Sequence, residues 1–162
     1  QLPLYYNHLN TGRPDPDSHS FNRYSSNYLD MSNEPLYPFG YGLSYTNFSY
    51  GNLQLSSDVL SRNGELTVSV TVTNDGDFDG YEIVQMYLHD IYAEISRPVK
   101  ELKGFERIFL KKGESREVKF VITEDDLRFY NSGLQYVYEP GEFDVMVGAN
   151  SRDVQTERFR AD

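Results

Sequence analysis

The chain has 162 residues, enough for one hydrophobic core with an extended segment beside it. Its 25 Asp and Glu against 15 Lys and Arg give a formal charge of −10, which argues against binding nucleic acid or an anionic membrane, because both need a basic face. Cysteine is absent, which excludes disulfides and thiolate metal sites, and no apolar run approaches the roughly 20 residues that span a bilayer. The composition therefore predicts no cofactor, no nucleic acid partner and no membrane partner.

The first fifty residues predict an extended arm. They hold eight of the fourteen tyrosines and three phenylalanines but no Val and no Ile, the residues that favour strands. Prolines at positions 3, 14, 16, 35 and 38 interrupt any helix, and the polar stretch 11–27 is typical of a loop. Eleven aromatic rings are nevertheless too many for a disordered tail. We therefore expect residues 1–50, and above all PLYPFGYGLSYT (35–46), to dock on a neighbouring surface.

Residues 51–162 predict an all-β domain. ELTVSVTVTN (65–74) alternates apolar and polar residues, the pattern of a strand with one buried and one wet face. Further strands are expected within 81–90, 97–110, 115–122, 127–131, 134–141, 142–149 and 156–161, while Thr123 could cap a single helical turn. Their number and spacing predict an antiparallel immunoglobulin/fibronectin type III-like β-sandwich with an irregular N-terminal arm. The lack of Trp and Cys excludes the disulfide-centred antibody variant, and an eight-stranded barrel would leave the first fifty residues unexplained.

A possible calcium loop occurs at DGDFDG, Asp75 to Gly80. It matches the first six positions of the pattern D-x-D-x-D-G, in which carboxylates bind the cation. The twelfth position should be a bidentate Glu but is Met86, and it falls inside a predicted strand. The sequence therefore favours a polar turn between two strands, with calcium binding as the minor alternative.

Catalysis by this chain is not indicated. Glycoside hydrolysis needs two carboxyl groups about 5–9.5 Å apart, one of them with a raised pKa. The carboxylates lie in predicted turns or on polar strand faces, as at Glu65, Glu101, Glu106, Glu114 and Glu117. Tyrosine faces could bind sugar rings, but most of these rings lie on the irregular arm rather than on a rigid surface. Docking to protein is the commoner use of such a segment.

Five motifs resemble one known family. QLPLYYNHLNTGRP, LYPFGYGLSYTNF, VTVTNDGDFDGYEIVQMYL, RPVKELKGFERI and EPGEFDVMVG resemble, in this order, the C-terminal part of glycoside hydrolase family 3, bacterial periplasmic β-glucosidase type. Together they span nearly the whole chain. Because the chain begins QLPLYYNHL, without Met, we expect it to be part of a longer protein.

The resemblance implies an arrangement for the arm. In this family a (β/α)8-type barrel and an α/β sandwich precede a fibronectin type III-like domain. Residues 1–50 would then be the linker that crosses from the second domain to the third, followed by the β-sandwich at 51–162. The resemblance implies interdomain docking through four ring anchors, Tyr37, Phe39, Tyr41 and Tyr45. The expected partners are the catalytic domains of the parent enzyme, although an arm without them could also pack against a second copy.

The resemblance also implies what this stretch lacks. Family members are retaining enzymes whose Asp nucleophile lies in the barrel, within a Ser-Asp-Trp-like motif. This chain has no Trp, and its Ser57-Asp58 pair is followed by Val59, so no catalytic residue can be assigned. We expect a non-catalytic accessory domain of a periplasmic or secreted β-glucosidase. A carbohydrate-binding module that targets the enzyme to polysaccharide is the alternative.

Overall fold

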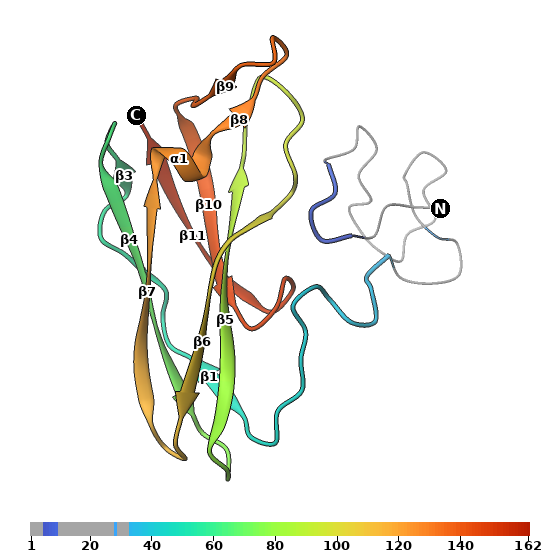
Figure 1. The fold of residues 1–162 in the computed structure, drawn as a ribbon, viewed down its shortest axis with the longest axis vertical. Helices are drawn as coiled ribbons and strands as arrows, with labels where there is room; N and C mark the ends of the chain where they lie inside the picture. Colours follow the sequence, from blue (N-terminus) through green and yellow to red (C-terminus); the bar gives the residue numbers. More distant parts are fainter. Residues whose placement is uncertain (1–4, 10–27, 29–32) are drawn as a thin grey trace.

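The chain folds as a β-sandwich in the computed structural model, which describes residues 5–9, 28 and 33–162 (Figure 1). The four-stranded sheet consists of β1 (Phe48–Tyr50), β4 (Glu65–Asn74), β2 (Gln54–Leu55) and β7 (Ser115–Thr123), with β4 pairing to all three others. The five-stranded sheet has the order β3 (Val59–Leu60), β11 (Val154–Ala161), β10 (Gly141–Gly148), β5 (Gly80–Asp90) and β6 (Glu101–Leu110). All pairs are antiparallel except β3 with β11. The predicted fold class is confirmed.

The core lies between the two sheets and follows the period of two seen in the sequence. In β4, Leu66, Val68, Val70 and Val72 are at most 2% exposed, while the threonines and serine between them face outward. The facing sheet contributes side chains from β5, β6, β10 and β11, among them Val84, Met86, Ile108, Leu110, Phe143, Val145 and Phe159. Alternation of apolar residues on both sheets thus builds one continuous core.

Small elements close one end of the sandwich. The predicted helical turn is present as α1 (Glu124–Leu127), where the backbone N–H of Thr123 donates to Oδ2 of Asp126 at 2.8 Å. The stretches predicted as strands near 127–131 and 134–141 form a separate small hairpin, β8 (Phe129–Tyr130) with β9 (Tyr136–Val137). The short strands β1, β2 and β3 had no pattern of their own, because two or three residues cannot show alternation.

The arm lies outside the sandwich. Residues 33–47 run past β5 and lead into β1 at the end opposite the β8–β9 hairpin (Figure 1). The predicted loop at 11–27 lies outside the described residues. The predicted boundary after residue 50 stays a prediction, and the first sheet residue is Phe48. Within the described ranges, no helix has the length and hydropathy needed to cross a membrane.

Candidate docking surface

Backbone carbonyl groups of the arm accept hydrogen bonds from Gln85 on β5 and from Ser151 in the β10–β11 turn. Nε2 of Gln85 donates to the carbonyl oxygen of Gly40 at 3.1 Å and to that of Ala149 at 2.6 Å. The N–H of Ser151 donates to the carbonyl oxygen of Phe39 at 2.9 Å. Gly40 has φ +78°, and a Cβ at this position would collide with the Gln85 side chain, so both backbone and space demand glycine. These contacts set which arm residues face the sheet.

Stacked rings cover the outer face of β5 next to these bonds. The rings of Tyr6 and Phe39 are stacked with centroids 4.0 Å apart, and Tyr6 meets Tyr87 edge-on at 5.9 Å. Tyr87 is fully buried, and its hydroxyl donates to Oε1 of Gln85 at 2.6 Å. Burial raises the pKa of Tyr87 above its ordinary value. The arm thus packs on the sandwich itself as well as presenting rings to solvent.

Two loops of the sandwich complete the seat of the arm. The N–H of Val99 donates to the carbonyl oxygen of His8 at 2.9 Å, beside a bridge between Leu9 and Pro98. Nζ of Lys100 donates to the carbonyl oxygen of Ser151 at 2.5 Å, which ties the 98–100 loop to the β10–β11 turn. Burial lowers the pKa of Lys100, and Glu34 opposes this shift. The described arm residues therefore rest on β5 and on two loops that flank it.

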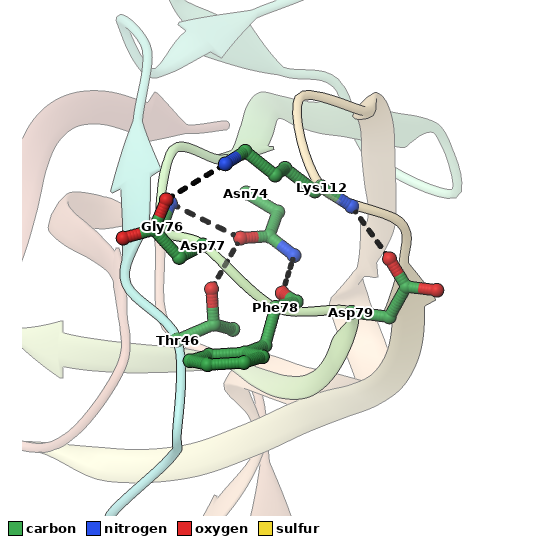
Figure 2. A network of polar contacts seen from close by, with 7 residues as sticks. All are labelled: Thr46, Asn74, Gly76, Asp77, Phe78, Asp79 and Lys112. Atoms are coloured by element: carbon green, nitrogen blue, oxygen red, sulfur yellow. Dashed lines mark hydrogen bonds and ion pairs between the residues drawn. The ribbon is translucent and has the colours of Figure 1, made fainter.

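A buried polar network fixes the point where the arm enters the sandwich (Figure 2). Asn74 is fully buried, and its Oδ1 accepts from Oγ1 of Thr46 at 2.7 Å and from the N–H of Gly76 at 3.2 Å. Its Nδ2 donates to the carbonyl oxygens of Phe78 at 2.8 Å and Leu110 at 3.1 Å. One side chain thereby joins the arm, the β4–β5 turn and the end of β6.

The DGDFDG turn is held by a lysine in this structure. Oδ1 of Asp77 lies 2.7 Å from Nζ of Lys112, and Oδ1 of Asp79 accepts from the backbone N–H of Lys112 at 2.9 Å (Figure 2). Met86, at the position of the twelfth calcium ligand, is buried in the core. In the described part of the chain, no group of three or more acidic or histidine side chains could hold a metal. The favoured polar turn is what the structure contains.

The four predicted ring anchors are all at least 41% exposed. Tyr37 and Tyr41 are 67% and 41% exposed, with ring centroids 5.3 Å apart, so they form one cluster. Phe39 is 44% exposed and stacks on Tyr6, while Tyr45 is 97% exposed. The structure thus brings Tyr37 and Tyr41 together and turns Phe39 partly inward. The interdomain role of the four residues stays a prediction.

Two carboxyl groups on β5, half-buried Glu82 and buried Asp90, have a raised pKa, and their positions bear on catalysis. Burial raises the pKa of Glu82, whose Oε1 accepts from the Tyr50 hydroxyl at 3.2 Å. Burial also raises the pKa of Asp90, which Arg97 opposes from 3.9 Å. The two residues are eight positions apart on β5, about 26 Å at roughly 3.3 Å per residue. A glycosidase pair needs about 5–9.5 Å, so these two groups cannot act on one bond.

Sequence reasoning missed the residues that receive the arm. Gln85 and Tyr87 alternate with core residues of β5, so the period of two places them on the outward, solvent-facing side. They are buried because the arm, more than 40 positions earlier, covers that face. The sequence offers one weak signal for this burial: Gln and Tyr carry polar atoms that can form hydrogen bonds when another segment covers them.

Three comparisons with known proteins agree. The profile of the fibronectin type III-like domain matches residues 82–151. The chain is 51% identical over 160 residues to a periplasmic β-glucosidase of Salmonella typhimurium, and 45% identical over 137 residues to a putative β-xylosidase of Formosa agariphila. It superposes on 99% of its length, with TM-score 0.91 and 46% identity, on a β-glucosidase of Listeria innocua crystallised with gluconolactone.

The matched stretch is a minor part of these relatives. It makes up 21% of the Salmonella protein, 18% of the Formosa protein and 22% of the Listeria chain. In contrast, it takes up 98%, 85% and 99% of the present chain. The chain therefore spans about a fifth of the length of the proteins that it resembles.

Proposed function

The chain belongs with the C-terminal, fibronectin type III-like part of the glycoside hydrolase family 3 β-glucosidases, and from this premise we propose that it is a non-catalytic accessory domain that docks on the catalytic domains of its parent enzyme. The arm would lie between the two parts. Its inner side holds the sandwich, and its outer side presents the rings of Tyr37, Phe39, Tyr41 and Tyr45 to the catalytic domains.

One observation carries the proposal: an arm with a fixed backbone holds its large rings in solvent. Hydrogen bonds from Gln85 and Ser151 hold the arm at Phe39 and Gly40. Yet Tyr45, a few residues on, is 97% exposed. Each aromatic ring that a partner covers removes a large apolar area from water, worth about 25 cal/mol per Å². Such a row of rings is typical of a surface that another domain covers.

The proposed role is to stabilise a parent enzyme that hydrolyses terminal β-glucosidic bonds, located in the periplasm or secreted. The named activities of the Salmonella and Listeria relatives support the reaction, and the name of the Salmonella protein supports the location. Relatives of this stretch include both a β-glucosidase and a putative β-xylosidase. The choice of sugar would therefore reside in the other four fifths of the enzyme.

A hybrid enzyme tests the docking of the arm. In it, this chain replaces the matched stretch of the Salmonella β-glucosidase, and the Tm of the hybrid is compared with that of the isolated chain. Tyr45→Ser should lower the Tm of the hybrid and leave that of the isolated chain unchanged, since 97% of Tyr45 is already exposed. Tyr130→Ser, on the β8–β9 hairpin and 63% exposed, is the matched control. Equal Tm values for the hybrid with and without Tyr45→Ser would contradict the proposal.

A carbohydrate-binding module is the second candidate, and the same rings favour it. Tyr37 and Tyr41 are exposed neighbours that a sugar ring could stack against. Affinity electrophoresis of the isolated chain in gels that contain β-glucan separates the two functions. Retardation that is lost in Tyr41→Ser would favour the module, whereas unretarded migration favours the docking domain. Turnover of an aryl β-glucoside by the isolated chain would contradict both.

A further inference from the structure

A second apolar surface lies on the outer face of the five-stranded sheet. It consists of four side chains from the paired strands β5 and β6, which we call the β5–β6 patch: Tyr81, Ile83, Phe105 and Phe109. They are 51%, 46%, 68% and 39% exposed. Tyr81 lies opposite Phe109 in register, with ring centroids 4.9 Å apart. Exposed apolar groups gathered in this way mark an interaction surface.

The β5–β6 patch begins where the cover provided by the arm ends. Ile83, Gln85 and Tyr87 share one face of β5 because side chains alternate along a strand. The arm covers Gln85 and Tyr87 and reduces their exposure to 4% and 0%, whereas Ile83 remains 46% exposed. Phe105 is the partner of Gln85 in the sheet register. The patch and the arm are therefore parts of one continuous surface.

The apolar character is local to this side of the sandwich. The outward face of β4 carries Thr67, Ser69, Thr71 and Thr73. On the β10–β11 part of the same sheet, Arg158 pairs with Glu142 and Asp144. β6 is moreover an edge strand, with a row of backbone groups that no further strand of the described chain pairs. A long edge strand beside an apolar face is normally covered by other parts of a protein.

Arg107 adds a polar feature to the β5–β6 patch. Its guanidinium carbon lies 3.6 Å from the centre of the Tyr81 ring, a cation–π contact. The described part of the chain gives Arg107 no carboxylate partner. A partner surface complementary to the β5–β6 patch is therefore apolar and places a carboxylate or carbonyl oxygen opposite Arg107.

We infer that the β5–β6 patch is the second half of the docking surface, and that its occupant is the polypeptide that precedes the arm in the full-length enzyme. This inference rests on the proposed function. The described arm residues Tyr6 and Gly40 lie against the same face of β5, so the arm connects a preceding domain to the sandwich on the side that carries the patch. In the relatives, about four fifths of the chain lies outside the matched stretch, ample to cover the patch.

A second copy of the chain is a poorer occupant. Each copy has a formal charge of −10, and the long-range repulsion between two such chains opposes their association. A domain of the same chain does not have to associate from solution, because the linker keeps it at a high effective concentration near the patch. Charge and connectivity therefore both favour the parent chain.

Photo-cross-linking in the hybrid enzyme tests this inference. p-Benzoylphenylalanine replaces Phe105 in the hybrid described above, in the fraction that cleaves an aryl β-glucoside and is therefore folded. The same group replaces Tyr41 in a second protein, to report on the arm, and Thr71 in a third, on the polar face of β4. After irradiation, the cross-linked peptides are identified by mass spectrometry. We expect Phe105 and Tyr41 to cross-link to the Salmonella-derived part within one molecule, and Thr71 to give no such product.

The other outcomes overturn the inference in distinguishable ways. If Tyr41 cross-links to the catalytic part but Phe105 does not, the patch is not covered and the proposed function stands. If neither does, both fail. Products between two molecules from Phe105 would make a second copy the occupant. Equal yields from Thr71 and Phe105 would show that capture is not specific to the patch. Independently, Phe105→Ser should lower the Tm of the hybrid but not that of the isolated chain.

Discussion

Removing the Asn74 side chain, by replacement with Ala, should cost more stability than removing any other polar side chain at the arm junction. The side chain is fully buried and makes four hydrogen bonds, two as acceptor and two as donor. Figure 2 shows the bonds to Thr46, Gly76 and Phe78. Each intramolecular hydrogen bond contributes a net of about 0.5–1.5 kcal/mol, so their loss amounts to about 2–6 kcal/mol. The carbonyl oxygen of Leu110 also loses a partner in a buried position, which places the expected loss near the middle of that range, about 4 kcal/mol.

Urea unfolding followed by circular dichroism measures this loss. With a slope of about 1–3 kcal/mol per M for a small domain, a 4 kcal/mol loss shifts the midpoint by roughly 1–4 M. The slope itself should not change, because the substitution leaves the folded surface intact.

Two further variants separate hydrogen bonding from packing volume. Thr46→Val keeps the shape of its side chain and removes one bond to Asn74, so we expect a loss of about 1 kcal/mol. Asn74→Asp keeps the shape as well, but turns a carboxylate oxygen toward the carbonyl oxygens of Phe78 and Leu110. It should therefore destabilise at least as much as Asn74→Ala. A loss below about 1 kcal/mol for Asn74→Ala would refute the reasoning, as would a neutral Asn74→Asp.

The remaining predictions concern the half-buried Glu82, the contact of the arm with Gln85, and the β4–β5 turn. Partial burial raises the pKa of Glu82 above its ordinary 4.5, so between pH 4.5 and the raised pKa the folded state binds more protons than the unfolded state, and the free energy of unfolding falls as the pH rises. Glu82→Gln should make this fall less steep in urea titrations at several pH values, and an unchanged pH dependence would contradict the prediction. Gly40→Ala places a Cβ on a residue with positive φ and against the Gln85 side chain, which should weaken the neighbouring hydrogen bond from the Ser151 N–H to Phe39. Hydrogen exchange at the Ser151 amide should therefore accelerate, and unchanged exchange would show that other contacts hold the arm. Lys112→Met removes an exposed ion pair with a 2.7 Å contact and should change the free energy of unfolding by less than about 1 kcal/mol; a larger loss would reveal a structural role for that pair.

The β-sandwich could be predicted from the sequence, because the patterns that indicate its strands are local. The alternation of Leu66, Val68, Val70 and Val72 follows from side chains pointing to opposite sides of a strand, so it marks both the strand and its buried face. The capped turn at Thr123 is equally local, since cap and acceptor are three residues apart. The absence of strand-forming residues marked the arm in the same way.

The way in which the arm packs on the sandwich could not be predicted from the sequence, because it depends on contacts between distant residues. The burial of Gln85 and Tyr87 depends on Gly40 and Tyr6, and the burial of Asn74 depends on Thr46, partners that lie 28 to 81 positions away. No pattern of period two contains such a contact, because periodicity reports only which face of a strand a residue occupies. The arm divides the outer face of β5 into a covered half, at Gln85 and Tyr87, and an apolar half that stays exposed, at Tyr81 and Ile83. That division arises from long-range packing, so the register of the arm on β5 had to be seen in three dimensions.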